Sequence, residues 1–203
     1  MKFMNYKLIL ASNSPRRKEL LNGLDIDFEV RIIPDIDESH PTDTPPEEIP
    51  AFIAQKKADA YRATIKEDEL VITADTVVIL DGDILEKPAD KNDAIKMIKR
   101  LSGCKHQVIT AVALTTAAWN KVFSVESKVD FAELTDNEIE YYVDKYKPFD
   151  KAGAYGIQEW IGYIGVKSIE GSFYNVMGLP IQRLYQELKN LPSRRLLQPE
   201  VSQ

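Results

Sequence analysis

Cysteine and histidine are scarce in this sequence, which has one cysteine, Cys104, and two histidines, His40 and His106, among its 203 residues. One cysteine cannot form a disulfide within the chain, and such low usage suits a reducing compartment. The two histidines form no metal-ligand pattern. We therefore expect Cys104 to be chemically inert, and we expect His106 to pack or hydrogen-bond inside the protein rather than to bind a metal.

Long apolar runs are also missing, because no segment approaches the roughly 20 apolar residues that cross a membrane as a helix. The apolar start "MKFMNYKLILAS" is too short for a secretion signal with a cleavage site. The formal net charge of -6 lacks the basic excess that favours DNA or RNA. These absences predict a cytoplasmic protein that binds neither membrane nor nucleic acid, although a local group of cations can still bind a small anion.

What is present is the composition of a globular protein, with 44% hydrophobic and 29% charged residues and enough length for a sizeable core. Apolar periodicity and capping residues predict helices at 15–23, 47–63, 90–103, 135–146 and 181–191. Alternation and β-branched runs predict strands at 8–11, 27–34 and 69–80, two or three strands within 106–134, and a strand, turn and strand within 160–180.

The alternation of strands and helices predicts an α/β architecture. No internal repeat, low-complexity tract or clear linker divides the chain. We therefore expect one domain, in two lobes, over residues 1–192. The residues after it, 193–203, are expected to form a disordered tail.

The segment "LILASNSPRRKELL" places serines and arginines where a predicted strand passes into a helix. Ser14 followed by Pro15 is typical of a helix cap and first turn. A helix N-terminus binds anions through its free N–H groups, and guanidinium groups match phosphate oxygens in pairs. Ser12, Arg16 and Arg17 with Ser14 thus form a candidate triphosphate site. The alternative is a plain helix cap with solvated arginines.

An aspartate, Asp75, stands among β-branched residues in "TADTVV". Burial of a carboxylate is costly without a partner. We expect Asp75 at a strand end, where it would bind a divalent cation or act as a base toward water, with the Thr76 hydroxyl beside it. A turn-capping aspartate is an equally acceptable interpretation of this motif alone.

Four further polar residues are candidates only in combination. Glu38 lies in an acidic loop, Lys57 lies on the second predicted helix, and Lys87 lies in "LEKP". Each alone is typical of a solvated surface charge. Gln158 ends "DKAGAYGIQ", whose glycines allow backbone to approach a ligand closely, and its amide can read the edge of a base. The alternative is a loop followed by an ordinary polar residue.

Seven segments occur in the order and approximate spacing of one family: "ASNSPRR", "EEIPAFIAQKKA", "ADTVV", "LEKP", "LSGCKHQVITAV", "KAGAYGIQ" and "VMGLP". From about Leu8 to the closing helix, the chain thereby resembles the Maf family, the septum-formation-inhibitor-like nucleoside triphosphate pyrophosphatases. The form "DKAGAYGIQ" resembles the branch that hydrolyses dTTP and UTP. The resemblance implies a Maf/ITPase-like α/β fold, with a mixed twisted sheet flanked by helices and two lobes around a substrate cleft.

The resemblance also implies an activity, the conversion of a nucleoside triphosphate to the monophosphate and pyrophosphate with Mg²⁺ or Mn²⁺, in a homodimer. It makes Asp75 the catalytic base and, with Glu38, a metal ligand. It makes Arg16, Thr76 and Gln158 the specificity residues. The other residues that it implies for the phosphate and metal site are Ser12, Arg17, Lys57 and Lys87.

The sequence departs from the family pattern at three places. Asn13 stands between the serines in place of a small residue, and Ala111 replaces a common glycine. Glu159 and Trp160 follow Gln158 where a glycine is usual, beside the residue implied to read the base.

Three functions are open at this point. The first is a house-cleaning pyrophosphatase that keeps non-standard nucleotides out of nucleic acids. The second is a nucleotide-binding regulator of septum formation with incidental hydrolysis. The third is a phosphatase or kinase of another nucleotide, against which the absence of a P-loop pattern counts for kinases. The intact Asp75 and its basic companions favour an enzyme.

Overall fold

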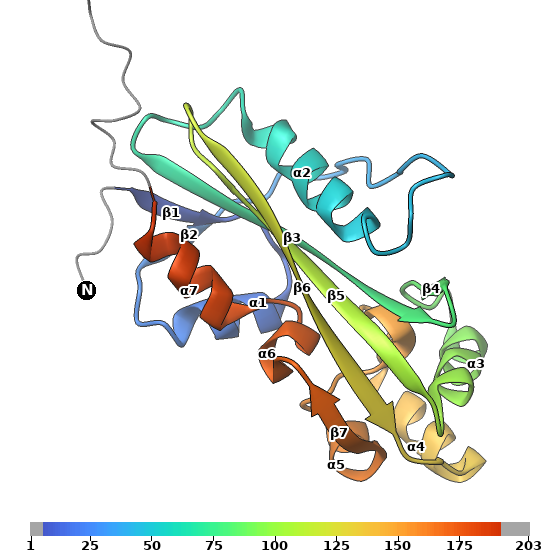
Figure 1. Ribbon diagram of the computed structural model, residues 1–203. Helices are drawn as coiled ribbons and strands as arrows, with labels where there is room; N and C mark the ends of the chain where they lie inside the picture. The colour runs from blue at the N-terminus through green and yellow to red at the C-terminus, as the bar shows by residue number, and fades with distance from the viewer. Residues whose placement is uncertain (1–5, 192–203) are drawn as a thin grey trace, which may run out of the picture.

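The fold is organised by one mixed sheet of seven strands. The computed structural model describes residues 6–191, and the tail expected at 193–203 lies outside them. The strands are β1 (Lys7–Leu10), β2 (Phe28–Val30), β3 (Glu69–Leu80), β4 (Asp83–Leu85), β5 (Lys105–Thr115), β6 (Asn120–Phe131) and β7 (Val166–Glu170). They lie in the order β2-β1-β3-β5-β6-β7, with β4 also paired to β3 (Figure 1).

Helices flank this sheet, which confirms the predicted α/β class (Figure 1). They are α1 (Pro15–Asn22), α2 (Ile49–Tyr61), α3 (Lys91–Leu101), α4 (Asp136–Tyr146), η1 (Ala152–Ala154), α5 (Trp160–Gly165), α6 (Phe173–Val176) and α7 (Ile181–Lys189). Within residues 6–191, none of them has the length and apolar character needed to cross a membrane. The expectation of one domain in two lobes over 1–192 stays a prediction.

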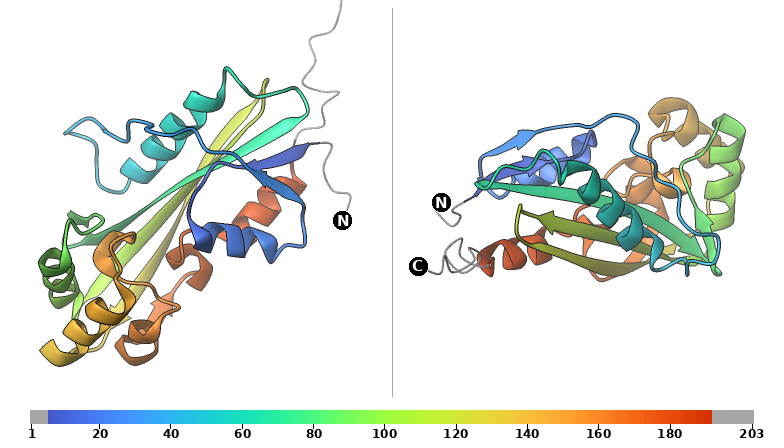
Figure 2. Two further views of the ribbon diagram at one scale, coloured as in Figure 1. Left: turned by 180° about the vertical axis from the view of Figure 1, so that it is seen from behind. Right: turned by 90° about the horizontal axis from the view of Figure 1, so that it is seen from above.

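Three strands of the sheet are unusually long. β3, β5 and β6 have 12, 11 and 12 residues, against the usual length of about five or six. β1 runs parallel to β2 and β3, and the other strand pairs are antiparallel. The helices α3 and α4 gather near one end of the long strands, and α1 and α7 lie nearer the other (Figure 2).

Successive residues of β3 face different layers, as the two-residue repeat of a strand requires. Val77 and Ile79 pack with Ile49 of α2. Val78 and Leu80 belong instead to the larger core on the opposite face. That larger core also includes side chains of α1, α3, α4 and α7. The sheet is therefore covered on both faces, and neighbouring residues of β3 meet different environments.

The helix boundaries follow the local chemistry of the sequence. The Ser14 hydroxyl accepts from the Arg17 N–H at the start of α1. Thr135 and Glu138 form the predicted capping box of α4. Ala111, one of the departures from the family pattern, packs with Ala54 of α2, where small side chains allow the helix to approach β5 closely. The predicted helices α1, α2, α3, α4 and α7 are confirmed.

The prediction of a strand, turn and strand within 160–180 is wrong, because only β7 is a strand there. α5 precedes it and α6 follows it. A short apolar run fits a helix and a strand equally well by periodicity. At α6 the Ser172 hydroxyl caps the turn by accepting from the Asn175 N–H, and in α5 the Gly162 N–H donates to the Glu159 carbonyl.

The buried histidine has the packing role that its isolation in the sequence predicts. His106 is 2% exposed and meets the rings of Phe131 and Tyr155 edge-on. Its Nε2 lies 2.7 Å from the Tyr155 hydroxyl oxygen. Burial lowers the pKa of His106 to about 4, so this side chain is neutral at physiological pH.

We predict that His106 makes stability fall on mild acidification. The unfolded chain protonates this histidine near the ordinary histidine pKa of 6.5, whereas in the folded protein burial holds the pKa down at about 4. Its contribution is therefore full above about pH 6.5 and is lost as the pH falls toward 4. Urea unfolding of wild type and His106→Phe at about pH 7.5 and pH 5 should show about 2 kcal/mol more loss in wild type. Equal losses in both proteins would contradict this assignment.

A second prediction concerns the close approach at Gly162. A Cβ atom at Gly162 would lie 1.7 Å from the Ile157 carbonyl oxygen, whereas one at Gly165, in the same helix, would meet only Leu134 side-chain atoms at 3.4 Å and beyond and Ile161 at 3.9 Å. Gly162→Ala should lower the free energy of unfolding by about 3 kcal/mol or more. Gly165→Ala is the matched control and should change it by less than about 1 kcal/mol. Denaturant unfolding of both variants measures the contrast, and similar values would contradict it.

Candidate active site

The long strand β3 has one edge that is only partly paired. β5 pairs with β3 from Val71 to Ile79, so β1 and β4 share the opposite edge. β1 covers that edge at residues 69–72 and β4 covers it at residues 78–80. Among the described residues, no strand pairs with residues 73–77 on this side, and we call this stretch the β3 gap.

Asp75 and Thr76 lie within the β3 gap, in the middle of a continuous strand. The expectation that Asp75 ends a strand is therefore wrong. The sequence Ala-Asp-Thr keeps the extended backbone because β5 pairs with it throughout, with Ala111 opposite Asp75 and Thr110 opposite Thr76. Since side chains alternate along a strand, Asp75 faces α2 and Thr76 faces the opposite layer.

Arg17 reaches the β3 gap from the first turn of α1. Its Nη1 donates to the Ala74 carbonyl at 2.9 Å, and its Nη2 donates to the Thr76 hydroxyl at 3.1 Å. Its Nε donates to the Gly178 carbonyl at 2.8 Å. Burial lowers the pKa of Arg17, but a guanidinium remains protonated and needs such acceptors. Arg17 therefore joins α1, β3 and the segment after α6, which is a positioning role beyond the phosphate contact that the resemblance implies.

Asp75 forms part of a charged group on the α2 side of the sheet. Lys57 of α2 places its Nζ 2.9 Å from Asp75 Oδ1 and 3.0 Å from Glu38 Oε2. The Lys57 and Asp75 side chains are only 15% and 14% exposed, whereas Glu38 is 47% exposed. One ammonium thus holds two carboxylates from distant parts of the sequence at a single place.

This charged group fits the metal that the resemblance implies, provided that a ligand supplies further oxygens. In the part of the chain from 6 to 191, no three His, Cys, Asp or Glu side chains gather as a metal site. Mg²⁺ is often bound by one or two carboxylates, with waters and substrate phosphates completing its shell. Glu38 and Asp75 are donors of this kind, and they converge on Lys57. They would hold the cation together with the phosphates.

Two connected pockets adjoin the β3 gap. The outer pocket has a volume of about 520 Å³, within the roughly 300–1,000 Å³ typical of small-molecule sites. The predicted site residues that line it are Ser12, Arg16, Arg17, Glu38, Lys57 and Lys87. The predicted residues that line the inner pocket are Arg16, Arg17, Thr76, Lys87 and Gln158. Asp75 lines a third pocket, which shares Glu38 with the outer pocket and Lys87 with both of the others. The structure therefore brings the predicted residues together around three adjoining pockets, which we call the cleft.

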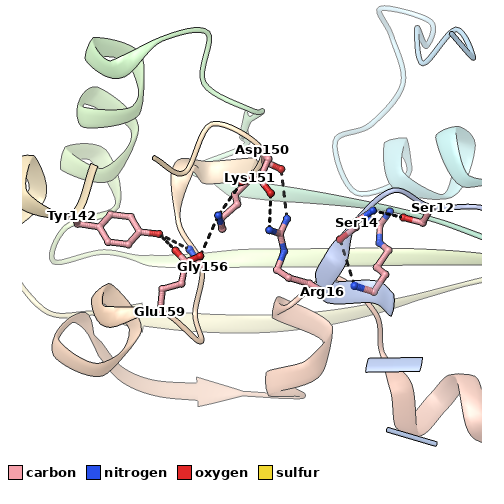
Figure 3. Close-up of polar contacts among 9 residues, drawn as sticks. Ser12, Ser14, Arg16, Tyr142, Asp150, Lys151, Gly156 and Glu159 are labelled. Carbon is pink, nitrogen blue, oxygen red and sulfur yellow. Dashed lines mark hydrogen bonds and ion pairs between the residues drawn. The ribbon is translucent and has the colours of Figure 1, made fainter. Parts of the chain in front are cut away.

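The serines of the first motif are engaged by their own turn. Ser12 Oγ accepts from the Ser14 N–H at 3.2 Å, and Ser14 Oγ accepts from the Arg17 N–H at 3.4 Å (Figure 3). Both residues still line the outer pocket. The plain-cap interpretation is thus correct for Ser14, because its hydroxyl and carbonyl accept from the Arg17 and Lys18 N–H groups and Pro15 has no N–H to bind an anion.

A chain of charged contacts runs along the wall of the inner pocket, and sequence reasoning missed most of it (Figure 3). Arg16 Nη1 lies 2.8 Å from Asp150 Oδ2, and Lys151 Nζ lies 2.9 Å from Asp150 Oδ1 and 3.1 Å from Glu159. Burial alone would raise the pKa of Asp150, but hydrogen bonds from Lys151 and Arg16 outweigh it and lower the pKa to about 2. Glu159 also accepts from the Tyr142 hydroxyl. Asp150 and Lys151 begin the "DKAGAYGIQ" motif, so adjacent charges before a glycine-rich turn were the available signal.

The same contacts hold the segment that carries Gln158. The Gly156 N–H donates to the Tyr142 hydroxyl at 3.0 Å, which ties this segment to α4. Gln158 Oε1 is buried and has no hydrogen-bond partner in the protein. A buried amide oxygen without a partner is costly unless a ligand supplies a donor. Gln158 thus brings an amide with an unused acceptor to the wall of the inner pocket.

Sequence comparisons match nearly the whole chain to known proteins. A family model described as Maf-like protein matches residues 7–191. A protein of Bacteroides thetaiotaomicron named dTTP/UTP pyrophosphatase is 61% identical over 186 residues, which are 92% of this chain and 96% of that protein. A protein of the same name from Parabacteroides distasonis is 62% identical over 185 residues, 91% of this chain and 96% of that protein.

One solved structure supports the fold independently. The Staphylococcus aureus Ham1 protein is 20% identical and has a TM-score of 0.52, and the match covers 89% of this chain and 99% of that chain. At this identity the likeness concerns the fold alone.

We predict that the two neighbouring arginines differ sharply in their contribution to stability. Arg17→Lys should lower the free energy of unfolding by about 2–4 kcal/mol, because one ammonium cannot reach three acceptors that the guanidinium satisfies. Arg16→Lys is the matched control. It should cost less than about 1 kcal/mol, because Asp150 is 55% exposed and solvent screens that pair. Denaturant unfolding measures both values, and equal losses would contradict the positioning role of Arg17.

Proposed function

The chain belongs to the family of Maf-like proteins, and from this premise we propose that it hydrolyses dTTP and UTP to the monophosphate and pyrophosphate. Two relatives with the name dTTP/UTP pyrophosphatase, at 61% and 62% identity, support this substrate class. The observation that carries the proposal is the cleft at the β3 gap. Asp75 belongs to the charged group on one face of the strand, and Thr76 lines the inner pocket on the other face.

In this proposal, the triphosphate and the base bind in different parts of the cleft. Arg16, Arg17 and Lys87 line the passage between the two pockets, and Lys57 lies beside Asp75. Cations at these places stabilise the negative charge that develops on the leaving pyrophosphate. Thr76 and Gln158 line the inner pocket, where hydrogen bonds to a pyrimidine would set selectivity.

The hydrolytic step needs a group that takes a proton from water. Water is a weak nucleophile at neutral pH, and a carboxylate that orients it and accepts its proton lowers the barrier. Asp75 is this base in our proposal. A bound Mg²⁺ or Mn²⁺, held by Glu38 and Asp75, supplies Lewis acidity and screens phosphate charge. Lys57 keeps both carboxylates in place before the substrate binds.

The proposed setting follows from the activity and from the sequence. Removal of non-standard nucleotides before they enter nucleic acids would suit such an enzyme. The single cysteine supports a reducing compartment, and we propose the cytoplasm. The family resemblance supports a homodimer, which sedimentation of the purified protein tests directly.

We predict the following outcome for a panel of nucleoside triphosphates incubated with the purified chain and Mg²⁺ or Mn²⁺. Chromatography should show that dTTP and UTP yield the monophosphate and pyrophosphate, and that purine nucleotides and 7-methyl-GTP react about ten-fold or more slowly. A chelator should abolish turnover. Asp75→Asn should lower kcat by about 10²–10⁴, while Asp59→Asn on the exposed face of α2 should leave it unchanged.

The products discriminate among the alternatives. A diphosphate with orthophosphate would identify a phosphatase instead. Binding of dTTP without turnover would favour a nucleotide-binding regulator. Near-normal turnover by Asp75→Asn at saturating Mg²⁺ would show that another group is the base.

A further inference from the structure

A buried threonine lies directly behind Thr76 and has no role in the site described so far. Thr76 and Thr110 are opposite partners in β3 and β5, and their hydroxyl oxygens are 2.9 Å apart. Thr110 is 0% exposed, and its hydroxyl also lies 2.9 Å from the Asn175 carbonyl oxygen at α6. The Asn175 carbonyl, Thr110 and Thr76 thus form a short chain that ends at the inner pocket.

The hydrogens of this chain are determined by counting donors. A carbonyl oxygen has no hydrogen to give, so Thr110 donates its single hydroxyl hydrogen to Asn175. The contact between the two threonines then requires Thr76 to be the donor and Thr110 the acceptor. Arg17 Nη2, which is a donor only, occupies one acceptor position of the Thr76 oxygen.

The Thr76 hydroxyl oxygen therefore presents a lone pair, and no hydrogen, to the inner pocket. A hydroxyl has one hydrogen and two acceptor positions. The hydrogen is committed to Thr110, and Arg17 uses one acceptor position, so one acceptor position remains. Thr76 is half-buried and lines the inner pocket with the apolar side chains of Val78 and Val108.

We propose that Thr110 is a positioning residue that fixes Thr76 as a hydrogen-bond acceptor and thereby selects pyrimidines that carry a ring N–H. The inference rests on the proposed function, whose substrates are dTTP and UTP. Uracil and thymine have an N–H between their two carbonyls. Cytosine has an unprotonated ring nitrogen at that place, which would oppose its lone pair to that of Thr76.

The decisive measurement is the ratio of kcat/KM for UTP to kcat/KM for CTP. Thr110→Val keeps the shape of the side chain and removes the hydroxyl, which frees the Thr76 hydrogen to donate toward the pocket. The ratio should fall about ten-fold, because cytosine gains a hydrogen bond from Thr76 while the hydrogen bond from uracil to Thr76 is weakened. Thr110→Ser restores the hydroxyl and should keep the ratio within about two-fold of wild type.

A matched control separates this effect from general damage to the strand. Thr115 is also 0% exposed and lies on β5, and its hydroxyl donates to Asn120 Oδ1 at 2.6 Å, outside both pockets. Thr115→Val should leave the ratio unchanged. If Thr110→Val does not fold, Thr110→Cys serves in its place, because a thiol is a weak acceptor and should lower the ratio in the same direction.

The outcomes separate this inference from the function on which it rests. Equal reductions for UTP and CTP in Thr110→Val, with the ratio unchanged, would overturn the role of Thr110 while the pyrophosphatase activity stands. A ratio that falls in Thr110→Val and returns in Thr110→Ser would support it. A wild-type protein that hydrolyses neither dTTP nor UTP would overturn the proposed function itself.

Discussion

The guanidinium of Arg17 at the β3 gap is the contact on which the arrangement of the site depends. A charge removed from water needs acceptors, and three segments of the chain supply them through Ala74, Thr76 and Gly178. The gap is what makes this possible, because strands that paired with residues 73–77 would occupy the space of the arginine. The unpaired edge of β3 therefore leaves room for the half-buried guanidinium, which in turn satisfies the Ala74 carbonyl on that edge.

Local chemistry explains which parts of the fold could be predicted from the sequence. Ser14 with Pro15, and Thr135 with Glu138, mark helix starts through contacts within one turn, so the sequence predicts α1 and α4 correctly. The secondary structure around Gly162 could not be predicted in this way. Its conformation depends on a close approach to the Ile157 carbonyl, and the periodicity of apolar residues does not reveal such a contact. Apolar residues alone do not distinguish its helix from a strand.

The candidate site is predictable in membership but not in geometry. The seven motifs point to Asp75, Thr76 and Gln158, and all of them border the cleft. The sequence does not reveal that Asp75 and Thr76 face opposite layers, because Ala-Asp-Thr resembles an interruption of the strand rather than its middle. It also does not reveal the contact between Asp150 and Arg16, which joins residues 134 positions apart.

The opposite orientations of Asp75 and Thr76 have an evolutionary consequence. Because the residues proposed for chemistry and for selectivity lie on different faces of one strand, we expect substitutions around Thr76 to change the preferred nucleotide without disturbing the charged group around Asp75. Insertions are a different matter. An insertion of one residue near the start of β3 would move Asp75 and Thr76 each to the opposite face of the sheet and exchange their environments. We therefore expect point substitution to be the tolerated route to a new nucleotide preference in this strand, and a change of its length to be the disruptive one.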